Sequence, residues 1–135
     1  MTTTLPLGSH HPLLGALERE WQATSHRSAS VRRAHTWGLP AAFDSLDGIV
    51  AATGWYATAE QRQAVRRCST ADIDAVMERL LLAARTDDLA ARVVLQRLLP
   101  GLASLARRWS RRYDGDALAD VVTAAWPVIR QYPLE

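Results

Sequence analysis

The most concentrated charge in the sequence is a group of four arginines within six residues, Arg107, Arg108, Arg111 and Arg112. On a helix, positions i, i+1, i+4 and i+5 lie on one side, so the four guanidinium groups would form a compact basic edge. The planar guanidinium binds phosphate with two parallel hydrogen bonds, which makes this edge a candidate for contact with nucleic-acid phosphates. The alternative is a solvated helix end, where arginines meet the negative end of the helix dipole.

A second, weaker basic pair precedes this edge. Arg66 and Arg67 would extend the edge if the fold brings them near it. Residues 45–52 and 59–67 also have the outline of two short helices around a turn, although their connector is longer than that of a DNA-binding helix-turn-helix. A DNA-binding regulator that uses arginine-rich helices therefore stays open as an alternative function.

Other kinds of chemistry find little support in the sequence. All 16 residues in the Lys and Arg class are arginine, which excludes a lysine Schiff-base enzyme and a Walker-type phosphate loop. Histidine spacing and the single cysteine, Cys68, predict no metal site. We expect no enzymatic activity, no cofactor and no small-molecule substrate. The acidic candidates for catalysis are better explained as helix caps and first-turn acids; they are Asp87, Asp88, Asp114, Asp116 and Asp120.

Composition limits the class of protein. A chain of 135 residues with 48% hydrophobic and 22% charged residues is typical of one soluble globular domain. The net charge of +2 excludes a general polycation. The first residues lack the pattern of a secretory signal, and no stretch approaches the ~18 apolar residues of a membrane span. We therefore expect a cytoplasmic protein that does not enter a membrane.

Apolar periodicity predicts an all-α helical bundle, because helical spacing is frequent and alternating β-type runs are absent. Three amphipathic helices are expected within residues 70–132, the first capped by Thr70 and the last by Asp116. Their very short links favour an antiparallel arrangement. Pro100 predicts a kink or a break in the middle helix, and Pro127 predicts a bend in the last.

The first half of the sequence predicts shorter elements. Residues 1–12 are expected to form a flexible arm, and residues 13–135 a single helical domain. Within it, residues 13–68 hold short helices and connectors, with a loop over 25–30 and a helix capped by Asp44, and residues 69–135 hold the three-helix unit.

The tryptophans divide into two groups by position. Trp109 and Trp126 lie on apolar stripes and are expected in the core. Trp37 and Trp55 lie in predicted loops and are candidates for an exposed contact with a partner.

Residues 80–132 resemble a known family. The runs LLAARTDDLAA, LLPGLASLARR and DALADVVTAAW are similar to the front part of conserved region two of bacterial sigma factors. In that family an acid-capped helix of the form D-x-x-Q-E-x-F/W grips the clamp helices of the largest RNA polymerase subunit. Asp120 and Trp126 match the acidic and aromatic positions, whereas Thr123 and Ala124 replace the glutamine and glutamate.

The resemblance implies a non-enzymatic, transcription-associated helical module that binds RNA polymerase, DNA or both. On this interpretation Asp120, Thr123 and Trp126 would carry the polymerase contact. The matched stretch does not include the part of the family that melts and reads promoter DNA, so we expect a module that does not direct initiation by itself. A helical protein-interaction or homo-oligomerisation module is the remaining alternative.

Overall fold

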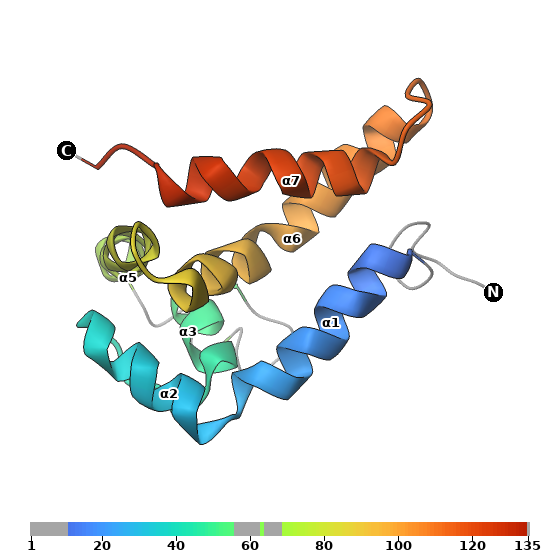
Figure 1. Cartoon of the computed structure of the whole chain (residues 1–135). Helices are drawn as coiled ribbons and strands as arrows, with labels where there is room; N and C mark the ends of the chain where they lie inside the picture. Colours follow the sequence, from blue (N-terminus) through green and yellow to red (C-terminus); the bar gives the residue numbers. More distant parts are fainter. Residues whose placement is uncertain (1–10, 56–62, 64–68, 135) are drawn as a thin grey trace.

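The computed structural model describes residues 11–55, 63 and 69–134, and within these residues the protein is a bundle of helices without a strand (Figure 1). The predicted all-α bundle is therefore confirmed. The elements, in chain order, are α1 (Pro12–Ser25), α2 (Ser28–Ala34), the 3-10 turn η1 (His35–Trp37), α3 (Leu46–Ala52), α5 (Thr70–Ala84), α6 (Asp88–Ser110) and α7 (Ala117–Arg130).

Two helices begin one residue away from the predicted cap. The α5 helix is capped by Ser69 rather than Thr70, because Ser69 accepts a hydrogen bond from the Asp72 N–H and Asp72 accepts one from the Ser69 N–H. This reciprocal pair is a capping box, which satisfies two backbone donors at once. Likewise, Ser45 rather than Asp44 caps α3, through a bond from the Gly48 N–H.

The N-terminal residues are more ordered than the sequence predicts. His11 and Pro12 belong to the predicted flexible arm, but His11 caps α1 by accepting a hydrogen bond from the Leu13 N–H, and Pro12 is the first helical residue. Proline suits that position because its missing N–H would have no partner there. The α2 helix begins at Ser28, inside the predicted loop. Residues 1–10 lie outside the described part of the chain.

Asp87 connects the first half of the chain to the start of α6. Its carboxylate caps α6 by accepting hydrogen bonds from the backbone N–H groups of Leu89 and Ala90. The same carboxylate accepts bonds from Arg33 at 3.0 Å and from the Trp37 indole at 2.9 Å. Trp37 is 7% exposed, so the prediction of a solvent-facing partner contact is wrong for this residue. Trp37 is the last residue of η1, and its indole donates to Asp87, the N-cap residue of α6, rather than facing solvent.

The central element of the bundle is α6, which packs against α3, α5 and α7. Figure 1 shows α7 lying along α6, whereas α5 is seen end-on and crosses them. The predicted antiparallel arrangement therefore describes α6 and α7 but not α5. Between the N-terminal helices and α6, Trp21 is the largest fully buried side chain, and its indole donates to Asp47 on α3 at 2.7 Å.

Pro100 lies inside α6 and does not break it, because the helix continues to Ser110. The core nevertheless divides near this residue. The larger cluster holds the first half of α6 down to Leu99, together with residues from the N-terminal helices and α5. The smaller cluster holds four buried residues at the other end of the α6–α7 hairpin: Ala106, Ala117, Leu118 and Val121. Leu102 packs against both clusters.

Asp87 should make stability dependent on pH. Burial raises the pKa of its carboxyl, but hydrogen bonds from Trp37, Arg33 and the backbone outweigh burial and lower the pKa below 3.8. A carboxyl whose folded pKa is depressed stabilises the fold above its unfolded pKa and loses that contribution as the pH falls through the folded pKa. We expect Asp87→Asn to lower the free energy of unfolding by about 1–2 kcal/mol at neutral pH, with the difference from wild type shrinking below pH 3.8.

Urea unfolding followed by circular dichroism at several pH values measures this difference. Asp74→Asn, on the exposed side of α5, is the matched control and should change stability little. An equal loss for both variants, or a difference for Asp87→Asn that persists in acid, would contradict this role of Asp87.

Candidate nucleic-acid interface

The four arginines of the predicted basic edge lie together at the C-terminal end of α6. We call Arg107, Arg108, Arg111 and Arg112 the arginine surface. Arg107 is half-buried and the other three are exposed. The helix ends at Ser110, so Arg111 is its C-cap residue and Arg112 lies in the turn beyond it. In Figure 1 this end of the α6–α7 hairpin projects past the remaining helices.

Three arginines elsewhere in the bundle form ion pairs that join helices. Arg33 pairs with Asp87, and Arg92 pairs with Glu20 on α1 at 2.7 Å while also donating to the Leu17 carbonyl. Arg130 on α7 pairs with Asp88 at the start of α6. These ion pairs and hydrogen bonds join helices that are distant in the sequence.

The arginine surface differs from these pairs. Within the described residues, none of its four guanidinium groups has an ion pair or a hydrogen bond to another protein group. The four line one open surface hollow of about 1070 Å³ together with Ser104, Leu105, Trp109 and Tyr113. Four neighbouring cations without protein counter-charges form a surface that favours an anionic ligand.

Two aromatic side chains accompany the arginine surface. Trp109 is 56% exposed and Tyr113 is 45% exposed. The prediction that Trp109 lies in the core is therefore wrong. Its apolar stripe continues in phase, but the end of α6 extends beyond the helices that could cover it (Figure 1). Sequence periodicity gives the face of a helix but not whether another element reaches that face.

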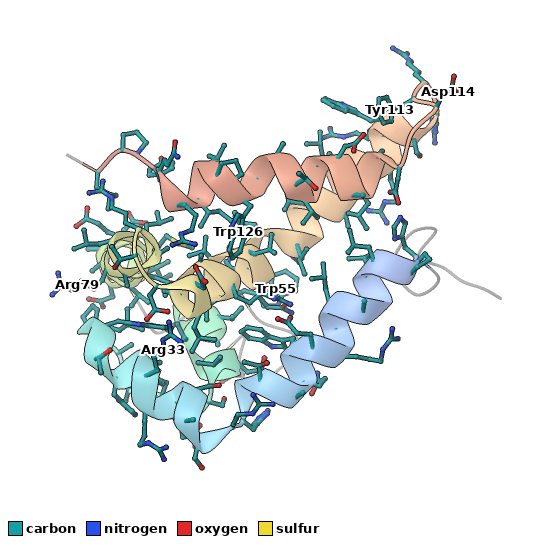
Figure 2. The ribbon with its side chains drawn as sticks, viewed as in Figure 1. Arg33, Trp55, Arg79, Tyr113, Asp114 and Trp126 are labelled. Carbon is teal, nitrogen blue, oxygen red and sulfur yellow. The ribbon has the colours of Figure 1, made fainter. Side chains whose placement is uncertain are left out.

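Tyr113 is held by α7. Its hydroxyl donates a short hydrogen bond to the Asp120 carboxylate, and Figure 2 shows Tyr113 and Asp114 at the projecting end of the hairpin. The link between the helices is also fixed at Asp116, which caps α7 through the Ala119 N–H and is 3.1 Å from Nε2 of His11. The Ala119 bond is the main cause that lowers the pKa of the Asp116 carboxyl, and His11 adds to it. The Asp116 cap was expected from the sequence, whereas the bonds Tyr113–Asp120 and His11–Asp116 were not, because only the folded chain brings those side chains together.

The proposed polymerase-contact residues do not share one surface. Asp120 and Thr123 are exposed on the outer side of α7, beside Ala124, Pro127 and Val128. Trp126 instead packs partly buried against the larger core cluster, and Figure 2 shows it on the side of α7 that faces α6. The guanidinium of Arg130 lies 5.8 Å from its ring centroid. Trp126 therefore acts in packing, as its apolar stripe predicted.

The remaining candidates have separate outcomes. Arg66 and Arg67 lie outside the described residues, as does the second half of the helix-turn-helix outline apart from residue 63. Trp55 is 38% exposed and lies 5.9 Å from the Arg97 guanidinium, far in the chain from the arginine surface. Among the described residues, no group of three or more His, Cys, Asp or Glu side chains could hold a metal ion.

Neither a protein-family model, nor a curated protein, nor a solved structure matches the chain. The similarity to sigma factors thus rests on the sequence pattern alone.

One helix of the described residues, α6, is long and apolar enough to cross a membrane by length and composition, although the sequence predicted no such stretch. The same helix is the centre of the core. Its packing against α3, α5 and α7 accounts for its apolar residues, since the buried helix of a folded bundle has the same composition.

The bond between Tyr113 and Asp120 gives a titration that can be measured. Hydrogen bonding to the Asp120 carboxylate, with its negative charge, raises the pKa of the Tyr113 hydroxyl above 10.0. Because the carboxylate favours the neutral phenol, we expect Asp120→Asn to bring this pKa back toward 10.0. Tyrosinate absorbance against pH measures the shift, with Tyr113→Phe identifying which transition belongs to Tyr113. A transition unchanged by Asp120→Asn would show that the bond does not form in solution.

Proposed function

We propose that the protein is a non-enzymatic, transcription-associated helical module of the cytoplasm that binds nucleic acid through the arginine surface. The observation that carries this proposal is the grouping, at the projecting end of the α6–α7 hairpin, of four guanidinium groups that have no counter-charge among the described residues. Phosphates are the ligands for which the arginine fork is suited, because two N–H groups can bond two phosphate oxygens.

The acids near this end do not neutralise the arginine surface. Asp116 is engaged by the α7 backbone and His11, and Asp120 accepts its bond from Tyr113. Asp114 is the third acid of the link and is exposed. The arginines therefore present an excess of positive charge over a short distance, although the whole chain carries only +2. Binding through such a surface should depend steeply on salt, because each phosphate contact releases counterions.

Salt dependence tests the nucleic-acid proposal. In a fluorescence anisotropy titration with labelled DNA at several salt concentrations, each phosphate contact adds about 0.9 to the slope of log Kobs against log salt for duplex, and about 0.7 for a single strand. We expect the triple variant R108A/R111A/R112A to lose about 2 to 3 units of this slope and most of its affinity at low salt.

The triple variant R19A/R27A/R32A is the matched control, because it removes the same charge from exposed positions. Arg19 lies on α1, Arg27 is the N-cap residue of α2 and Arg32 lies on α2. It should bind almost as wild type does. Equal losses for the two variants would reduce the interaction to net charge, and no binding by wild type at low salt would exclude the proposal.

A second candidate function is the docking of RNA polymerase on α7, as the sigma-like pattern implies. The observation in its favour is the outer side of this helix, where Asp120 precedes a row of uncharged exposed residues: Thr123, Ala124, Pro127 and Val128. Val128 is 61% exposed. A mostly uncharged helix face with one acid at its beginning suits contact with another helix. Trp126 is partly buried against the core, so this contact would rest on Asp120 and Thr123.

Capture of purified RNA polymerase by the immobilised protein tests this second function. Asp120→Arg should abolish capture, because it reverses the one charge on the outer side of α7. Tyr113→Phe removes the bond between Tyr113 and Asp120 but keeps the Asp120 carboxylate, so it shows whether capture needs the charge or the bond. Asp74→Arg on α5 is the charge-matched control. An empty capture by wild type at low salt would exclude this function, while light scattering that shows a stable dimer would favour self-association of the same face.

A further inference from the structure

We infer that the arginine surface selects single-stranded over double-stranded nucleic acid, because it combines phosphate contacts with exposed aromatic rings on which bases can stack. This inference rests on the proposed nucleic-acid function and adds the class of ligand. The residues that carry it are Trp109 and Tyr113, which line the same open hollow as the four arginines.

Trp109 belongs to neither core cluster of the described residues. It lies between Arg108 and Ser110 in the last turn of α6, and 56% of its side chain is exposed. The small core cluster below this end of α6 is formed by other residues, Ala106 and Leu118 among them. An indole left in water forgoes the stabilisation that burial would give. Its exposed surface is available to a ligand that offers a flat apolar partner.

Tyr113 supplies a second ring in a fixed position. The bond from its hydroxyl to Asp120 ties the exposed side chain to α7. Because this bond already restrains the ring, a ligand that stacks on it loses less free energy to ordering the side chain. Gly115 supports the same placement, since a Cβ added there would lie 2.8 Å from the Tyr113 ring.

Bases differ in accessibility between the two forms of nucleic acid. In a duplex each base face is covered by its neighbours, so an aromatic side chain cannot stack on it without unstacking the helix. In a single strand the base faces are free, and proteins that bind single strands combine a basic groove with aromatic platforms. Arginines alone would hold either form through its phosphates. The two rings beside them favour the single strand.

Stacking on base faces also predicts weak discrimination among bases and sugars. Every base has a π-face, so recognition of this kind tolerates sequence. Phosphate and base-face contacts do not use the 2′-hydroxyl, by which proteins distinguish RNA from DNA. We therefore expect oligothymidylate and oligouridylate to bind with similar affinity.

An exposed tryptophan is also a common anchor for a protein partner. The arginines around Trp109 favour nucleic acid, because they surround the ring with cations and no acid of the link is left unengaged except Asp114. Protein docking remains an outcome of the test: it would leave single-strand affinity independent of Trp109.

Three fluorescein-labelled probes separate these possibilities: oligothymidylate, oligouridylate and a mixed-sequence duplex. Each is about 16 nucleotides long, the upper end of common single-strand sites. In anisotropy titrations of the full chain, Trp109→Ala should weaken the single strands by about 5- to 150-fold, the range for loss of one stacked base. Its duplex affinity should stay close to wild type. Trp109→Phe should recover much of the loss, because phenylalanine still stacks.

Tyr132→Ala is the matched control, since Tyr132 is 46% exposed at the end of the chain remote from the arginine surface. It should leave all three affinities unchanged. Quenching of protein fluorescence by oligothymidylate, present in wild type and reduced in Trp109→Phe, gives a second measurement of stacking at this residue.

The failures of the two proposals are distinguishable. If R108A/R111A/R112A loses binding while Trp109→Ala binds single strands as wild type does, the proposed function stands and the selection of single strands is wrong. Equal affinity of wild type for duplex and single strands, or a preference of more than about tenfold between the two single-stranded probes, would also overturn it. If no probe binds, both proposals fail.

Discussion

The carboxylate of Asp87 is the interaction on which the arrangement of the bundle depends. It caps α6, the helix that packs against α3, α5 and α7, and at the same time accepts hydrogen bonds from Arg33 and Trp37. A single group thus starts the central helix and attaches the N-terminal half of the chain to that start. Among the described residues no comparable carboxylate lies at the other end of α6, where Trp109 and three of its neighbouring arginines are exposed.

The arginines are chemically identical but differ in their contacts: some join helices, and others form the arginine surface. Arg33, Arg92 and Arg130 join helices through carboxylates that lie close in the folded chain. The arginine surface has no such partners among the described residues. Four neighbouring cations repel one another, and an anionic ligand relieves that repulsion, so this surface favours the binding of an anion.

The sequence was sufficient for features set by local rules. Apolar spacing predicted α5, α6 and α7, and the aspartate caps of α6 and α7 were expected from residue type and position. It also predicted that the four arginines would lie together. It could not predict burial, because burial depends on which elements meet. Trp37 is buried where its indole bonds to Asp87, 50 residues along the chain, whereas Trp109 is exposed. The bond between Tyr113 and Asp120 was missed for the same reason.

The division of the core near Pro100 has a consequence for motion. Proline removes one backbone hydrogen bond of α6, and the smaller cluster beyond it has four buried residues with partly buried hydrophobics, Leu13 and Leu14 of α1 among them, packed against it. Segments with few buried contacts open more easily than the rest of a fold, so we expect the hairpin end to open at a lower free energy than the body. We therefore expect amide protons beyond Pro100 to exchange through this local opening, and a ligand that binds the end to slow their exchange more than that of the body.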